Sequence, residues 1–176
     1  MTSPAGAGPG AAKGLIASTG VQAISNENRT LSHIDLAQDM EGSAEANQPH
    51  GFVAGSDVVG LVSAPAAQSI AAAVSAWPRA AGLGQVIIKP LDGAVAGLDT
   101  GATAFPWRRQ AAVVQWYVYG VSTTASRWIS TAHAAVQPHS VGGYVNYLEP
   151  GTTAARYFAG NLAGLQGSGR STTRRG

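Results

Sequence analysis

The stretch QAAVVQWYVYG, residues 110–120, decides the fold, because it is the strongest strand signal in the chain. Its β-branched and aromatic residues favour extended structure, and a glycine ends it. Alternation of side chains along a strand gives it two different faces. One face carries Ala112, Val114, Trp116 and Val118, and the other carries Val113, Gln115, Tyr117 and Tyr119. The first face predicts a core, and the second mixes apolar with hydrogen-bonding groups.

Helical and extended patterns alternate on both sides of this strand. Extended segments are predicted at 51–62, 84–90, 93–99 and 142–147. Helices are predicted at 29–42, 64–77 and 122–136 and from Thr152 onward, where apolar residues recur at helical spacing. The three central strands follow one another too closely for parallel crossovers. The sequence therefore predicts an α+β fold, an antiparallel sheet with helices on one face.

Length and composition predict one domain with loose ends. The chain has 176 residues, of which 45% are hydrophobic and 11% charged. Residues 1–28 are rich in small residues and predict a flexible lead-in. Residues 29–166 form the predicted domain, and residues 167–176 predict a disordered basic tail. Because so few residues are charged, we expect a surface poor in charge, part of which a partner could cover.

The charge distribution gives little support for nucleic-acid binding. The formal net charge is +2, but Arg170, Arg174 and Arg175 lie within the last seven residues. Elsewhere no stripe of basic residues is interleaved with aromatics. The start lacks a signal-peptide pattern, and no run of eighteen apolar residues occurs. We therefore expect a cytoplasmic protein without nucleic-acid or membrane partners.

The stretch GGYVNYLEP, residues 142–150, raises the question of function. Read as a strand, it places Tyr144 and Asn146 on one face and Tyr147 on the other. Beside the strand at 110–120, it would bring Tyr144 and Asn146 close to Gln115 and Tyr117. Burying such groups without partners costs about 1–3 kcal/mol each, so they either bind one another or meet a polar ligand. Packing of the tyrosines under loops is the alternative.

The sequence contains no motif for several other kinds of functional site. The four histidines show no metal-binding spacing, and no cysteine is present, so no metal site is predicted. Lys13 follows a glycine-rich stretch but is followed by Gly14, which does not match a phosphate loop. No GxSxG motif of a serine hydrolase occurs. His133 lies in an apolar helix and is interpreted as a packed or surface residue.

Several ordered segments resemble a known family. FPWRRQAAVVQWYVYG, GGYVNYLEP and ARYFAGNLAGLQ resemble the C-terminal half of the berberine bridge enzyme-like FAD-linked oxidases. The upstream HGFVAGSDVV and GLGQVIIKPLDGAVAGLDTGATAF are similar to the substrate domain of that family. The resemblance covers roughly residues 29–166.

The resemblance implies an enzyme that oxidises an alcohol of a sugar or natural product by hydride transfer to FAD. It implies that Tyr144 or Tyr147 takes the substrate proton and that Gln115 and Tyr117 face the substrate. Asn146 would hold its segment near the flavin. A phenol titrates near pH 10, so a tyrosine base needs a neighbouring cation or the flavin itself. The sequence does not identify that cation.

Departures from the family pattern predict a fragment. The flavin-binding N-terminal domain of the family, with its glycine-rich loop, has no counterpart here, and the arginine tail replaces the family's final DPxxxF segment. The flavin would then be held by a separate FAD-binding domain. The alternative function is a non-catalytic α+β module that binds a small molecule or a protein. A third possibility is a chain that does not fold stably, because the surface that faces the missing domain is exposed.

Overall fold

The computed structural model describes residues 8–20, 22, 27, 29–41 and 49–173, and the chain divides into two units at Pro49. The first unit contains α1 (Gly8–Thr19) and α2 (His33–Glu41). α1 lies within the stretch for which we predicted no regular structure. α2 confirms the predicted short helix, and the Ser32 hydroxyl accepts a hydrogen bond from the Asp35 N–H at 3.1 Å. The apolar residues Leu31 and Ile34 of this segment are exposed.

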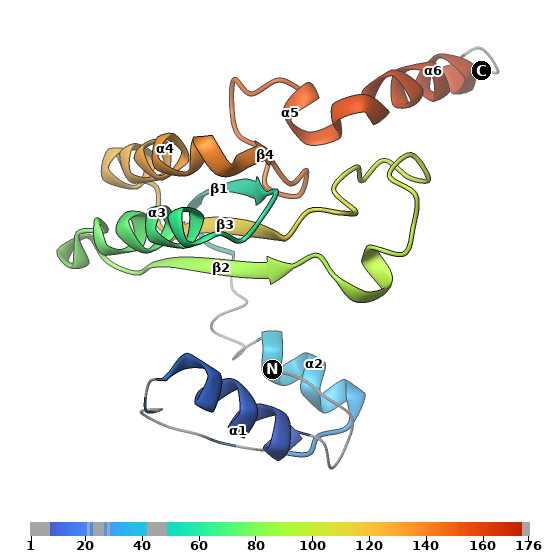
Figure 1. Ribbon diagram of the computed structural model, residues 1–176. Helices are drawn as coiled ribbons and strands as arrows, with labels where there is room; N and C mark the ends of the chain where they lie inside the picture. The colour runs from blue at the N-terminus through green and yellow to red at the C-terminus, as the bar shows by residue number, and fades with distance from the viewer. Residues whose placement is uncertain (1–7, 21, 23–26, 28, 42–48, 174–176) are drawn as a thin grey trace. The chain divides into compact units, whose positions relative to one another are not determined.

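The second unit, His50–Gly176, is built on a four-stranded antiparallel sheet (Figure 1). Its strands are β1 (Phe52–Val59), β2 (Gly84–Pro90), β3 (Ala112–Tyr119) and β4 (Ser140–Gly142). The order is β2-β3-β1-β4, so the strand quoted first lies in the middle. The predicted α+β class with an antiparallel sheet is confirmed.

Two helices cover one face of the sheet, as predicted: α3 (Ala64–Ser75) and α4 (Thr123–Val136). Each begins at a serine, Ser63 or Ser122, whose hydroxyl accepts a backbone N–H of the first turn. The core between helices and sheet contains Val114, Trp116 and Val118 from β3 and Ala125, Trp128, Ile129, Ala132 and Val136 from α4. The apolar face predicted for residues 112–118 is therefore the core face.

The opposite face of the sheet, here called the second face, has a smaller apolar cluster. Trp107 packs there with Val58 and Val113, and its indole N–H donates to the carbonyl of Gly143 at 2.9 Å. This hydrogen bond joins the loop before β3 to the segment after β4. The second face is thus covered at one end and accessible at the other.

Several segments differ from the sequence-based expectations. Residues 93–99 were predicted as a strand but contain the 3-10 helix Gly93–Val95, because Gly93 adopts a φ of 59° that a strand does not allow. Short 3-10 helices also occur at Arg79–Ala81, Gln137–His139 and Ala159–Asn161. The last helical region comprises α5 (Ala155–Phe158) and α6 (Leu162–Thr173). α6 extends into the stretch predicted as a tail.

No helix among the described residues is long and apolar enough to cross a membrane.

Replacing Gly142 by alanine should destabilise this unit. A Cβ atom at Gly142 would lie 2.3 Å from the Trp107 ring and 2.6 Å from the Arg156 carbonyl oxygen, which belongs to the backbone and cannot rotate away. We expect Gly142→Ala to lower the free energy of unfolding by about 1–3 kcal/mol, measured by urea titration with tryptophan fluorescence. Gly164→Ala, where no atom lies within 4 Å of the added carbon, is the matched control. Equal stability of the two variants would contradict this packing.

Candidate functional site

The predicted site residues of β3 lie on the second face of the sheet. Gln115 is 5% exposed although it is polar, and Tyr117 is half-buried. Lys89 of β2 is on the same face, because residue 89 pairs with Val113, and the odd-numbered residues of these two strands share that face. The second face thus carries a buried amide and a lysine among apolar side chains.

Lys89 is a cation that lies beside two of the predicted site residues, Gln115 and Tyr147. Its Nζ donates hydrogen bonds to Gln115 Oε1 at 3.1 Å and to the hydroxyl oxygen of Tyr147. The same nitrogen lies 4.8 Å from the centre of the Tyr147 ring. Lys89, Gln115 and Tyr147, here called the Lys89 cluster, therefore bring three segments together. Alternation along 84–90 was the available signal, since it places residues 85, 87 and 89 on one face of the sheet.

The stretch 142–147 is not the strand that we predicted. β4 ends at Gly142, and a turn follows in which the Tyr147 N–H donates to the Tyr144 carbonyl at 2.9 Å. The Tyr144 N–H donates to the side-chain hydroxyl of Ser56 at 2.8 Å, rather than to a backbone carbonyl of β1 as it would in a continued strand. The turn brings the rings of Tyr144 and Tyr147 to 5.6 Å, whereas a strand would separate them onto opposite faces.

Asn146 and Tyr144 form the outer part of this turn. The Asn146 side chain is exposed, and its Nδ2 donates to the Tyr144 hydroxyl at 3.0 Å. Phe105 packs edge-on against the Tyr144 ring at 5.8 Å. The two tyrosines are therefore distinguished by their partners: Tyr144 meets a neutral amide, whereas Tyr147 meets a cation.

Tyr117 belongs to an aromatic group at the accessible end of the second face. Its hydroxyl lies 2.7 Å from Nε2 of His50, and its ring stacks on Phe52 at 5.2 Å. Loss of solvent and the neighbouring Tyr119 raise the pKa of Tyr117 above its usual value. Tyr117 therefore remains a neutral hydrogen-bonding group, which suits contact with a ligand better than removal of a proton.

A groove of about 890 Å³ brings three predicted residues to one surface. It runs beside β1, between α4 and the segment 145–152, and Tyr117, Asn146 and Tyr147 line it. Phe52 and Ile129 add apolar wall, and Ser126 and Ser130 add hydroxyls. This volume suits a small molecule of moderate size. Gln115 and Tyr144 are not among its lining residues.

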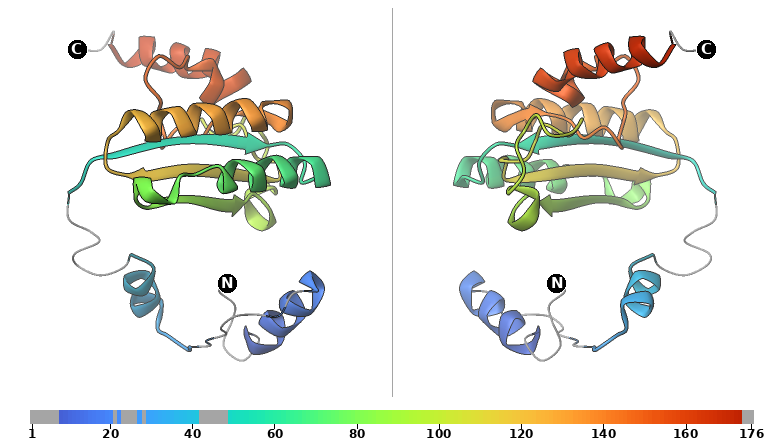
Figure 2. Two further views of the ribbon diagram at one scale, coloured as in Figure 1. Left: turned by 90° about the vertical axis from the view of Figure 1, so that its left-hand side faces the viewer. Right: turned by 90° about the vertical axis from the view of Figure 1, so that its right-hand side faces the viewer.

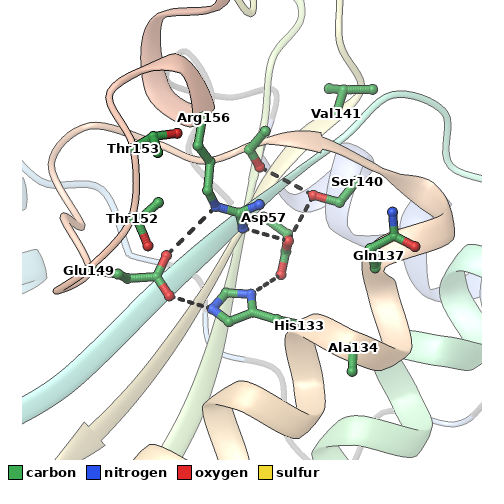
Figure 3. A pocket seen from close by; sticks show the side chains of 11 residues that line it. Asp57, His133, Ala134, Gln137, Ser140, Val141, Glu149, Thr152, Thr153 and Arg156 are labelled. Atoms are coloured by element: carbon green, nitrogen blue, oxygen red, sulfur yellow. Dashed lines mark hydrogen bonds and ion pairs between the residues drawn. The ribbon is translucent and has the colours of Figure 1, made fainter.

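A second group of polar residues lines another pocket, which shares His133 and Glu149 with this groove (Figure 3). It consists of Asp57, His133, Ser140, Glu149 and Arg156, here called the Asp57 cluster. Asp57 has a side chain 1% exposed and accepts hydrogen bonds from His133, Ser140, Arg156 and Trp116. The other nitrogen of His133, Nε2, lies 2.6 Å from Glu149 Oε1. Sequence reasoning missed this cluster, because His133 alone resembles an ordinary helix residue.

The Asp57 cluster fixes the charge of its members. Burial lowers the pKa of His133, but hydrogen bonds and charge attraction from Asp57 and Glu149 outweigh it and raise that pKa to about 9. Burial raises the pKa of Asp57, yet its bonds to His133, Trp116 and Ser140 bring the net result below the usual value. At neutral pH two carboxylates therefore face an imidazolium and a guanidinium.

Gly55 makes room for the His133–Glu149 contact. A Cβ atom at this position would lie 2.7 Å from both His133 Nε2 and Glu149 Oε1. A glycine within a strand commonly marks such a close approach, and this was the one sequence signal for the cluster.

Among the described residues, no group of three histidine or acidic side chains is arranged to hold a metal ion.

The stability of the chain should fall as pH rises through the titration of His133. Because the folded pKa of about 9 exceeds the unfolded value of 6.5, the stabilisation is complete below pH 6.5 and is lost as pH approaches and passes 9. The loss is on the order of 3 kcal/mol, measured by urea titration at each pH. In His133→Gln the slope over this range should disappear, and in His139→Gln, a histidine outside the cluster, it should remain. An unchanged slope in His133→Gln would contradict the assignment.

Comparisons with known proteins place the fold. No protein-family model matches the chain, and no curated protein matches it. Solved structures do match. BBE-like 1 from Physcomitrella patens is 18% identical with a TM-score of 0.72, covering 97% of this chain and 40% of its own. A variant of that protein gives 17% identity and a TM-score of 0.69, covering 92% of this chain and 39% of its own.

A third solved structure, BBE-like #28 from Arabidopsis thaliana, is 22% identical with a TM-score of 0.51 and covers 65% of this chain and 29% of its own. The chain therefore spans between 29% and 40% of the length of these proteins. The structural likeness confirms the resemblance drawn from the sequence motifs at the level of the fold. This chain has the fold of part of a BBE-like protein.

Proposed function

We propose that this chain provides the substrate-facing part of an FAD-linked oxidoreductase that oxidises an alcohol group of a sugar or natural product. The observation that carries the proposal is the Lys89 cluster, which places an ammonium group beside a phenol on the accessible face of the sheet. The fold shared with BBE-like proteins and the motif resemblance support a flavin as the oxidant.

The described residues fit one end of FAD. The second face offers flat aromatic rings at Phe52 and Tyr117 and the exposed amide of Asn146, which suit a planar heteroaromatic ring with polar edges. Asn146 is the residue that we expect beside the ring. Within the described parts of the chain, no glycine-rich loop leads from a strand into a helix to hold a pyrophosphate. A separate FAD-binding domain would supply that contact.

The chain's own residues would handle the proton of the alcohol. Tyr147 is the better candidate for the base than Tyr144, because its hydroxyl oxygen accepts a hydrogen bond from the Lys89 ammonium, whereas the hydroxyl of Tyr144 meets a neutral amide. Tyr147 would take the hydroxyl proton of the substrate, and Lys89 would hold the oxygen that receives it. Bound flavin would accept the hydride from the carbon that carries the hydroxyl group.

Tyr117 would orient the substrate directly, and Gln115, predicted from the sequence to face the substrate, would act on it by positioning Lys89. Gln115 keeps Lys89 in place through Oε1, and Tyr117 presents a neutral ring and hydroxyl in the groove that Tyr147 also lines. Orientation of this kind contributes to rate by holding the reacting atoms close together. Tyr144 would then support the turn, because its hydroxyl and ring contact Asn146 and Tyr147.

A non-catalytic binding module is the second candidate, and the groove beside β1 favours it. Its walls combine aromatic rings with serine hydroxyls, which is sufficient for binding without chemistry. Ligand binding in the groove that is independent of FAD, together with no flavin reduction by any alcohol, would support this candidate over the enzyme.

The purified chain should bind free FAD saturably through the ring end of the cofactor, although weakly because the pyrophosphate contact belongs to the separate domain, and an alcohol should bleach the visible absorbance of the bound FAD under anaerobic conditions. We expect Tyr147→Phe to retain FAD binding and to lower the rate of bleaching by a factor of about 10²–10⁴, as for loss of a general base. Tyr119→Phe makes the same chemical change on the same face outside the Lys89 cluster and should bleach at the parental rate. Absence of saturable FAD binding would overturn the proposal for this chain.

Lys89→Met should lower the bleaching rate roughly 100-fold, as expected when one preorganised donor beside a developing oxyanion is removed. Lys89→Arg keeps a cation and should recover part of the rate. Near-UV circular dichroism checks that the variants remain folded. A rate for Lys89→Met equal to that of the parent would remove Lys89 from the proposed mechanism and leave the role of Tyr147 to its own test.

A further inference from the structure

β2 is an edge strand with one unpaired side (Figure 2). The Tyr119 N–H donates to the Leu83 carbonyl and the Leu91 N–H donates to the Ala111 carbonyl, so odd-numbered residues of this strand make the hydrogen bonds to β3. The N–H and C=O groups of Gly84, Val86 and Ile88 therefore point outward. The backbone hydrogen bonds among the described residues include none from this outer side.

The outer side of β2 lacks the usual protection against pairing. Native edge strands commonly carry exposed charges, bulges or interior prolines. Here Pro90 occupies the last position, where its missing N–H would have pointed outward, so it blocks only the end of the strand. Lys89 is the one charged residue of β2, and it is engaged with Gln115 and Tyr147. Ile88 is 53% exposed.

We propose that two copies of this chain pair through their β2 strands, antiparallel about a twofold axis at Val86. In this register Val86 faces Val86 of the second copy, and Gly84 faces Ile88 of the second copy. Each of these pairs exchanges two hydrogen bonds, because all three residues direct their N–H and C=O groups outward. The two four-stranded sheets become one continuous sheet, and the interface is isologous.

The side chains are complementary in this register. On the helix-covered face, Gly84 has no side chain, and the Trp77 ring lies where a Cβ atom would be, at 2.7 Å. The exposed Ile88 of one copy would therefore lie over Gly84 and against Trp77 of the other, which buries apolar surface on both. A large residue opposite a small one is the arrangement that fills such a contact.

The charges also permit this pairing. Lys89 of one copy would face Leu83 of the other, and Leu83 is 59% exposed, so no two like charges lie opposite each other. On the second face, Gln85 would face Ile87 of the second copy. The pairing therefore buries no unpaired charge. A second copy of β2 supplies hydrogen-bond partners for the outward backbone groups, side chains of matching size and no opposing charge.

Single-cysteine variants test the register directly, because the chain contains no cysteine of its own. Cα atoms of a hydrogen-bonded antiparallel pair lie about 5.5 Å apart, within the range that a disulfide spans. Val86→Cys should give a covalent dimer on mild oxidation. Ile88→Cys is the matched control: the two thiols would lie roughly 14 Å apart at 3.4 Å rise per residue and should not cross-link.

Sedimentation velocity over a concentration series tests the pairing itself. The parent should approach twice its mass of 17.8 kDa, and Ile88→Lys and Val86→Pro should remain monomeric. Val86→Pro removes an outward N–H and also the Val86 side chain that packs against the core, so near-UV circular dichroism must verify that this variant folds. Ile88→Lys alters an exposed side chain and serves as the test if Val86→Pro unfolds. Leu61→Lys, the same change at another exposed apolar residue, should stay dimeric.

Three outcomes would overturn the proposal. They are a monomeric parent at every concentration, a dimer that Ile88→Lys leaves intact, and cross-linking of Ile88→Cys that equals that of Val86→Cys. None of these measurements involves flavin or turnover, so their outcome is independent of the enzymatic proposal.

Discussion

The buried carboxylate of Asp57 is the constraint around which this fold is arranged. An isolated charge at a side chain 1% exposed would cost several kcal/mol, so it must be matched by cations and hydrogen-bond donors. The matching groups come from different elements: Trp116 from β3, His133 from α4, Ser140 from β4 and Arg156 from α5. Satisfying one carboxylate therefore fixes four elements against β1.

This constraint extends to the candidate site through Glu149. His133 holds Glu149 with its second ring nitrogen, and the Tyr157 hydroxyl accepts a hydrogen bond from the Glu149 N–H at 2.9 Å. The end of the segment that begins at Tyr144 is thereby anchored, while its start is held by Ser56. A turn between two fixed points has few conformations, and this turn places the Tyr147 hydroxyl at Lys89. The Asp57 cluster thus acts on the site by positioning.

Much of the fold follows from local patterns, whereas the site depends on contacts between distant residues. Alternation in 112–119 and helical spacing in 123–136 predicted both elements, because each buries one face. The turn at Tyr144 was missed, because its β-prone residues resemble a strand and the deciding partner, Ser56, lies 88 residues away. Asp57 and Lys89 sit within strands as single charges, and sequence spacing does not reveal which residues pair with them.

The scarcity of charge then accounts for the surfaces that remain. Five charged side chains, with the imidazolium of His133 included, are engaged in the Asp57 and Lys89 clusters, which lie on the two sides of the same sheet. With only 11% of residues charged, few are left to solvate the outer edge of β2 or the accessible end of the second face. The outer edge of β2 combines outward-pointing backbone groups with the exposed Ile88, and the accessible end of the second face consists of aromatic rings with polar tips, compositions that favour contact with other molecules over contact with water. Because the charged side chains are concentrated in the interior, the outer edge of β2 and the accessible end of the second face carry few charges, and these are the two surfaces at which we propose binding.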